Sequence, residues 1–244
     1  MEFSNGTESW PPEQTVFAVP RVELRVLSED HPVHLENSAE IRANWDREIA
    51  ANPALFDGRM VLHRKLSVGP DGIAGEGHVV PFSTFLWWRR QAIRDGAFHV
   101  FGYAVIATAD GALVAIRMGQ HTANPGLVYF AAGSLDENDI VDGHCDMDGN
   151  IRREVLEETG LDLHDAVADD SYYASHLQRA VTVFRVFRLP LTAEEIVARI
   201  ERHMPVADDK EIAGAVIIRS ADPKAAPYHA SMLPILDWFF GGRR

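Results

Sequence analysis

The sequence has very little cysteine, few basic residues and no long apolar run. Cys145 is its only cysteine, so the chain can form no internal disulfide and no zinc site built from cysteines. Its 23 lysines and arginines are outnumbered by 36 aspartates and glutamates, which gives a net charge of −13. This charge repels phosphate backbones and anionic lipids, so we expect neither nucleic acid nor a membrane as a partner. No apolar segment approaches the ~18 residues that a transmembrane helix needs.

The beginning of the chain also lacks the features of a secretory signal. Residues 1–8 contain no basic start and no apolar stretch. The content of 46% hydrophobic and 24% charged residues is that of a folded protein rather than a disordered one. We therefore expect a soluble, cytoplasmic protein.

Hydrophobic periodicity predicts strands and helices mixed along the whole chain. Strands are expected at 22–27, 59–68, 99–108, 112–117, 127–131, 181–189 and 212–219, and helices at 38–51, 82–94, 150–159, 192–203 and near 237–240. Ser38 is expected to cap the first helix, and the glycine-rich residues 69–77 to form a turn region. This mixture predicts an α/β fold with a mixed sheet.

Asp95-Gly96 is the clearest break in the first half of the chain. We expect it to divide an N-terminal extension, residues 1–95, from a main domain, residues 96–244. The extension is expected to pack on the main domain or to contribute strands to it.

Three glutamates in the helix predicted at 150–159 form the most informative pattern. Glu154, Glu157 and Glu158 are spaced i, i+3 and i+4, which places three carboxylates on one helix face. Like charges crowded to ~4 Å near a protein surface repel by about 4 kcal/mol. A divalent cation among them removes this cost, and oxygen ligands suit Mg²⁺ or Mn²⁺. The pattern therefore indicates a metal site.

The segment Arg153-Glu154-Val155-Leu156-Glu157-Glu158-Thr159-Gly160-Leu161 resembles the second half of the Nudix box. The usual form of that box is Gly-x5-Glu-x7-Arg-Glu-aliphatic-x-Glu-Glu-x-Gly-aliphatic, and Gly133 resembles its opening glycine. The resemblance implies a Nudix-type α/β/α sandwich in the main domain. It also implies that Gly133, Arg153 and Gly160 are structural, and that Glu154, Glu157 and Glu158 bind Mg²⁺ or Mn²⁺.

The first half of the box departs from the usual form. Gly133 and Arg153 are 20 positions apart instead of 14, so six residues are inserted. The first box glutamate then falls at Asp139 or Cys145. Asp139, Asp142 or Asp146 could replace it opposite Arg153, and the sequence leaves the choice open.

The resemblance implies hydrolysis in which a carboxylate accepts the proton of the attacking water. Glu157 or Glu158 is our first candidate for this role, and Glu211 the second. The run 208–211 equally fits a polar turn, which is the interpretation we prefer. Arg117 is a candidate for binding phosphate, because guanidinium groups match phosphate geometry.

The resemblance implies an enzyme that splits a nucleoside diphosphate linked to another group into a nucleoside monophosphate and a phosphorylated remainder. Asn52-Pro53-Ala54-Leu55-Phe56-Asp57-Gly58, with Leu62-His63 after it, resembles the extension of a Nudix branch that includes UDP-glucose hydrolases. A UDP-sugar is therefore the best single substrate. The alternative is a non-catalytic Nudix module that binds a nucleotide or a protein partner in regulation. A homodimer is left open.

Overall fold

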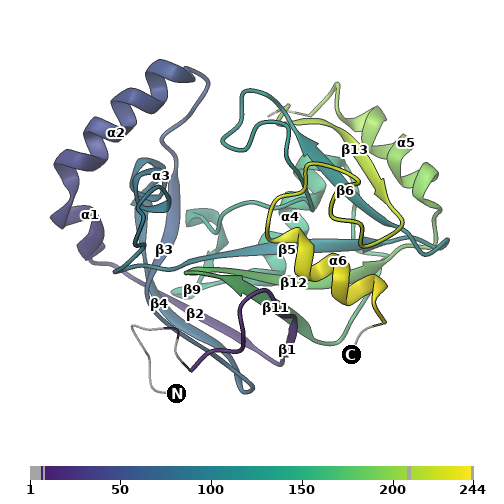
Figure 1. The fold of residues 1–244 in the computed structure, drawn as a ribbon, viewed down its shortest axis with the longest axis horizontal. Helices are drawn as coiled ribbons and strands as arrows, with labels where there is room; N and C mark the ends of the chain where they lie inside the picture. The colour runs from purple at the N-terminus through teal and green to yellow at the C-terminus, as the bar shows by residue number, and fades with distance from the viewer. Residues whose placement is uncertain (1–6, 8, 208–209, 243–244) are drawn as a thin grey trace.

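The chain forms two β-sheets and a set of covering helices (Figure 1), seen in a computed structural model that describes residues 7, 9–207 and 210–242. The strands are β1 (Phe17–Val19), β2 (Val22–Leu27), β3 (Arg59–Gly69), β4 (Gly72–Pro81), β5 (His99–Ala107), β6 (Leu113–Met118), β7 (Val128–Tyr129), β8 (Ile140–Val141), β9 (His144–Cys145), β10 (Val167–Ala168), β11 (Tyr172–Leu177), β12 (Ala180–Arg188) and β13 (Ile212–Ile218). The helices are α1 (Pro32–Glu36), α2 (Ser38–Ala51), α3 (Phe82–Arg89), α4 (Met147–Thr159), α5 (Ala193–His203) and α6 (Met232–Phe240), with a 3₁₀ turn, η1, at Glu137–Asp139.

The larger sheet has the strand order β1-β11-β12-β5-β6-β13, with β10 paired to β12 and β7 paired to β6. β12 and β5 run parallel, whereas the other neighbours in this order are antiparallel. The predicted α/β fold with a mixed sheet is confirmed.

Helices cover both faces of this sheet. A Cβ at Gly102 of β5 would lie 2.6 Å from Ile151, so α4 packs directly on that position. Gly102 is paired with Val183 of β12, and the next residue, Phe184, contacts Trp238 of α6. Because successive side chains of a strand point to opposite faces, α4 and α6 lie on opposite sides of the sheet. Figure 1 shows α6 in front of the strands and α4 behind them.

The smaller sheet has the order β3-β4-β2-β9-β8 and joins the extension to the box region. The inserted residues form the β8–β9 hairpin, whose turn at Asp142 and Gly143 has φ angles of 49° and 76°. Positive φ at both turn residues is typical of a tight type I′ hairpin turn. The Val26 N–H donates to the Gly143 carbonyl at 2.8 Å, so the insertion completes a sheet begun by the extension.

The extension and the main domain share strands and a core. β1 pairs with β11, and the Val61 N–H donates to the Leu135 carbonyl at 2.7 Å. One apolar cluster includes Leu24 and Val61 together with Val100 and Ile151. The boundary at residue 95 stays a prediction, and the contacts across it are extensive.

Most predicted elements are present, and the differences are these. The turn region expected at 69–77 is largely strand β4, which begins at Gly72. The short elements β1, α1, β8, β9, β10 and β11 were not predicted, and α6 begins at Met232 instead of near 237. Ser38 is the first residue of α2 rather than its cap. The helix expected at 82–94 ends at Arg89, after which the chain turns back and the Trp88 indole donates to the Asp95 carbonyl at 3.2 Å.

Candidate active site

The box helix α4 is fixed at both ends and along its buried face. The Asp146 side chain caps its start by accepting a hydrogen bond from the Gly149 N–H at 3.0 Å. Gly160 ends it in the left-handed conformation, with φ of 69°. Ile151 and Val155 are fully buried and anchor the helix to the sheet. The acidic face is therefore held in a defined orientation.

Asp139 is the carboxylate that lies opposite Arg153. The Arg153 guanidinium donates to the two carboxylate oxygens of Asp139 at 3.0 and 3.1 Å. The Asp139 side chain is only 2% exposed, and it also accepts from the Asn150 amide at 2.9 Å. Asp142 lies in the hairpin turn and Asp146 caps α4. Of the three candidates, Asp139 alone contacts Arg153, and the inserted residues follow it.

Glu154 fills a space that only glycine leaves open. Its side chain is 13% exposed and lies 2.9 Å from the Arg153 guanidinium. A Cβ at Gly133 would overlap the Glu154 carboxylate. Burial raises the pKa of Glu154 to about 8, against the opposing effect of Arg153. The opening glycine of the box thus makes room for the first of the three glutamates of the helix.

Glu158 is half-buried beneath the loop that contains the opening glycine. Its carboxylate accepts a hydrogen bond from the Ala132 N–H at 2.9 Å. Burial, and next the charge of Glu154, raise the pKa of Glu158 well above its usual value. Two neighbouring carboxylates are therefore partly shielded from water, and the negative charge of Glu154 disfavours ionisation of Glu158.

Glu157 has different surroundings. Its side chain is 52% exposed and forms an ion pair with Arg153 at 2.9 Å. Because Arg153 precedes it by four residues, the two side chains lie on the same helix face. The three glutamates are neighbours, as the spacing predicts, but Glu157 is the solvent-exposed member.

A cavity of about 970 Å³ opens beside this helix. Glu154, Gly133 and Asp136 line one side, and Glu211 also lines it, next to the start of β13. The charge of Glu211 contributes to the raised pKa of Glu158, so these carboxylates interact. Residues 208 and 209 of the expected polar turn lie outside the described residues.

Strand geometry explains why the cavity reaches α4. β5 and β6 pair only at their Ile106–Val114 and Ala107–Leu113 positions and then separate. Ser134 bridges to Phe101 in the gap, so the loop before η1 lies beside β5 there. This separation brings Gly133 and the α4 carboxylate behind it to the cavity wall.

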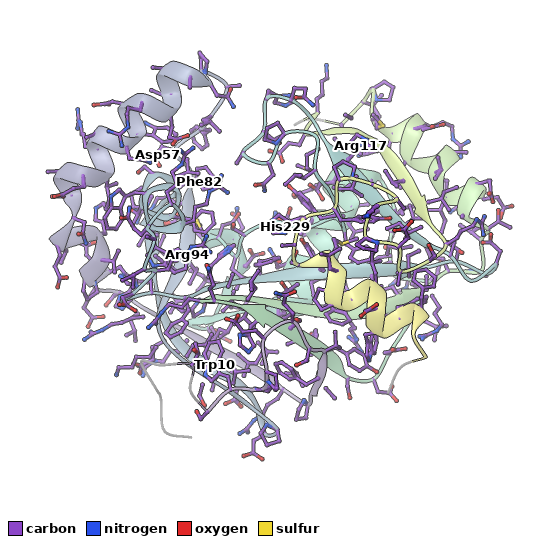
Figure 2. The ribbon with its side chains drawn as sticks, in the orientation of Figure 1. Trp10, Asp57, Phe82, Arg94, Arg117 and His229 are labelled. Atoms are coloured by element: carbon purple, nitrogen blue, oxygen red, sulfur yellow. The ribbon has the colours of Figure 1, made fainter. Side chains whose placement is uncertain are left out.

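The extension supplies the opposite wall. It contributes residues 54–56, 58–60 and 82 together with Phe85, Trp88, Arg89, Arg90 and Arg94. Figure 2 shows Phe82 and Arg94 on the side of the extension and His229 across from them. The cavity is thus formed between the two parts of the chain.

Arg117, the arginine favoured by the sequence, does not belong to this lining. Its guanidinium donates to the Gly126 carbonyl at 3.4 Å, and Figure 2 shows it away from His229, toward β13. Arg89 and Arg94 line the cavity instead. The signal for Arg89 in the sequence is the tryptophan-arginine run Trp87-Trp88-Arg89-Arg90, in which aromatic and basic residues adjoin, and Arg94 lies outside that run.

The carboxylates of the site fit a magnesium ion in chemistry, but they do not form a complete cage. No three His, Cys, Asp or Glu side chains within the described residues are arranged to hold a metal ion. Mg²⁺ commonly uses one or two carboxylates and completes its shell with water and substrate phosphates. Glu154 and Glu158, whose negative charges interact, suit this mode of binding. Within the same residues, no helix is long and apolar enough to cross a membrane.

Comparison with known proteins gives matches among solved structures alone. No family model matches the chain, and no curated protein does. DR0079 from Deinococcus radiodurans is 11% identical, with 75% of this chain and 99% of that chain covered and a TM-score of 0.45. The MutT protein from Methanosarcina mazei is 18% identical, with 58% and 92% covered and a TM-score of 0.38. The NUDIX domain of Shewanella oneidensis NrtR, complexed with ADP ribose, is 12% identical, with 57% and 84% covered and a TM-score of 0.39.

The last of these structures carries in its name the word NUDIX, the name of the box that residues 153–161 resemble. All three TM-scores are below 0.5, so the function is inferred below from this chain's own residues.

Proposed function

We propose that this chain is a Nudix-type, metal-dependent hydrolase that cleaves the diphosphate bond of a nucleoside diphosphate linked to another group. The observation that carries the proposal is the pair Glu154 and Glu158. Glu154 lines the cavity, Glu158 lies behind Ala132, which also lines it, and partial burial raises the pKa of each. Groups with perturbed pKa values next to a large cavity are typical of active sites.

Glu154 and Glu158 are the proposed magnesium ligands, and Glu157 is the proposed third ligand from the solvent side. When bound, Mg²⁺ supplies positive charge for the diphosphate and makes a nearby water molecule more acidic. Arg153 pairs with Glu157 and with Asp139, and this holds the loop and the helix in register. Without the cation, the carboxylates of Glu154 and Glu158 would repel each other.

Glu211 is the proposed acceptor for the proton of the attacking water. It lies on the cavity wall, whereas Glu157 is tied to Arg153 and Glu158 to the Ala132 N–H. A general base must reach the proton that it removes, so position in the cavity is the first requirement. Glu157 and Glu158, the first candidates from the sequence, are proposed as ligands.

The substrate is proposed to be a UDP-sugar. The run at 52–58 that suggests this class contributes Ala54, Leu55, Phe56 and Gly58 to the cavity lining. Asp57 fixes the run by accepting from the Ser83 N–H at 2.7 Å. Residues of the extension are therefore in position to select what the main domain cleaves.

The test is an assay of the full chain against a panel of nucleoside diphosphate derivatives, with UDP-glucose and ADP-ribose among them. We expect release of nucleoside monophosphate with magnesium and none with excess chelator. The best substrate in the panel tests the UDP-sugar proposal separately. Tight nucleotide binding without turnover of any member would replace the enzyme by the non-catalytic alternative.

A further inference from the structure

Arg89 and Arg94 line the cavity and form no ion pair with a carboxylate of the described residues. Ion pairs to Asp or Glu are formed by Arg21, Arg59, Arg90, Arg152, Arg153, Arg179, Arg185, Arg188 and Arg219. Within the described residues, no carboxylate oxygen lies within 4.0 Å of Arg89 or Arg94, and both line the cavity. In a chain of net charge −13, two unpaired cations in one cavity indicate an anionic ligand.

Arg89 is held in place by residues of the main domain, which lie across the cavity from the extension. Its guanidinium donates to the Ala123 carbonyl at 3.1 Å and to the Asn124 side chain at 3.5 Å. An arginine has five N–H donors, so these two bonds leave others for a ligand. Asn52 of the extension donates to the His121 carbonyl at 2.8 Å. This is a further hydrogen bond from the extension to the loop between β6 and β7.

The charge of Arg89 also reaches the carboxylate side of the cavity. Tyr129 hydrogen-bonds with Asn124, the partner of Arg89, at 3.4 Å. Burial raises the pKa of Tyr129, the charges of Glu158 and Glu211 raise it further, and that of Arg89 lowers it. A single side chain therefore lies within range of the arginine and of the two glutamates.

Arg94 has the stronger sign of a missing partner. Its Nε is buried and has no hydrogen-bond partner within the described residues. An unpaired buried donor on a cation is costly, and such a group in a cavity wall is satisfied by a ligand that brings acceptor oxygens. Phosphate oxygens match both the charge and the fork geometry of a guanidinium group.

The surface between the arginines and the carboxylates is aromatic. His99, Phe101 and Tyr103 are alternate residues of β5, so they share one face of the strand, and they line the cavity. Their neighbouring rings lie 5.0 and 5.2 Å apart between centroids. A row of aromatic rings beside unpaired cations suits a ligand that has both phosphate and a ring.

We propose that Arg89 and Arg94 of the N-terminal extension form an anion-binding subsite that holds the diphosphate of the substrate against the carboxylates of α4. The inference rests on the proposed function in that it takes a nucleoside diphosphate as the ligand. It adds that the main domain alone is an incomplete site, because its phosphate-binding cations come from the extension.

The test measures binding of α,β-methylene-UDP, whose bridging carbon resists hydrolysis, by isothermal titration calorimetry with magnesium present. Methylenediphosphonate is the second probe and reports the diphosphate alone. Arg94→Met is the cleanest variant, since Arg94 forms no side-chain hydrogen bond with the residues that the structure describes. Arg89→Lys and Arg89→Met follow, and Arg42→Met on the exposed side of α2 is the matched control.

We expect Arg89→Met and Arg94→Met to weaken binding of both probes roughly 10- to 100-fold, as for the loss of a charged hydrogen bond. Arg89→Lys should lose less, and Arg42→Met should bind as the parent chain does. Unchanged affinity in a folded Arg94→Met variant overturns the inference, as does a loss confined to Arg117→Met. Arginine-dependent binding without hydrolysis of any panel member would refute the proposed function but leave the subsite standing. Turnover with an unchanged KM in both Arg89→Met and Arg94→Met would support the proposed function and refute the subsite.

Discussion

The charged form of Glu158 destabilises the folded protein, because its carboxylate is shielded from water. Its carboxylate is enclosed, accepts one backbone hydrogen bond and faces the charges of Glu154 and Glu211. A raised pKa in the folded state means that the folded chain holds this proton more tightly than the unfolded chain does. Stability from this group is therefore present below the unfolded pKa and is lost as pH rises toward the folded value.

We expect Glu158→Gln to stabilise the metal-free protein at neutral pH while removing activity. The amide keeps the shape and the Ala132 hydrogen bond, but it carries no charge, so the unfolding temperature in chelator should rise by a few degrees. Turnover should fall by about 10²-fold or more. Thermal unfolding and the magnesium assay check the two effects.

Glu157→Gln is the informative companion, because Glu157 is exposed and paired with Arg153. It should lower turnover without raising the unfolding temperature, since no buried charge is removed. Glu201→Gln, at an exposed position of α5, should change neither property. Equal unfolding temperatures for Glu158→Gln and the parent chain would contradict the view that burial of this charge is costly.

At the scale of elements, regular periodicity predicted most of the longer strands and helices. Strand β4 was missed because it is rich in glycine. β4 reads as a turn region because Gly72, Gly75 and Gly77 weaken strand propensity. The structure gives the reason for two of these. A Cβ at Gly75 would lie 2.7 Å from Leu66, and a Cβ at Gly77 would lie 2.8 Å from Val61. These glycines allow close packing against β3, which no local pattern reveals.

The box motif predicted the helix and the neighbouring carboxylates, but not their partners. Asp139 and Arg153 are joined across the inserted hairpin, and the sequence left three aspartates open for that contact. Arg89 and Arg94 were missed because the cavity wall that they form depends on how the extension packs against the main domain. Long-range packing of this kind leaves no spacing to read in one sequence.

Gly160 permits a test of the end of α4. Its φ of 69° disfavours any side chain with a Cβ, and a Cβ there would lie 2.6 Å from the His203 ring. His203 in turn hydrogen-bonds to the Glu157 carbonyl at 2.9 Å, which ties α5 to the box helix. We expect Gly160→Ala to lower the free energy of unfolding by about 1–2 kcal/mol, measured by urea denaturation.

Gly69→Ala is the matched control for this change. Its Cβ would meet nothing within 4 Å, and its φ is not in the left-handed range. The control should unfold within about 0.5 kcal/mol of the parent chain. Similar urea midpoints for Gly160→Ala and the parent would show that the strain at this cap is relieved by a shift of α5.

At the scale of the whole molecule, the extension is an integral part of the fold. The inserted hairpin completes its sheet, β1 extends the larger sheet, and a common core runs through both parts. The cavity lies between them, so the packing that stabilises the protein also sets the shape of the site. Conditions that loosen the extension are therefore expected to weaken both stability and binding.

Acid is such a condition, because buried histidines of the extension are neutral in the folded chain. Burial lowers the pKa of His31 to about 4 and that of His63 to about 3. The charge of His78 lowers both pKa values further. In the unfolded chain both titrate near 6.5. The unfolded state thus binds more protons below pH 6.5, and stability falls as pH drops from there toward the folded pKa values.

We expect each histidine to contribute a slope of up to about 1.4 kcal/mol per pH unit below pH 6.5, with little change above pH 7.5. The measurement is urea unfolding between pH 8 and pH 5. His63→Leu replaces a ring whose two nitrogens lack partners in the described structure, and it should flatten this slope. His164→Gln, at an exposed position, should leave the slope unchanged. An unaltered slope in His63→Leu would show that the acid sensitivity does not come from His63.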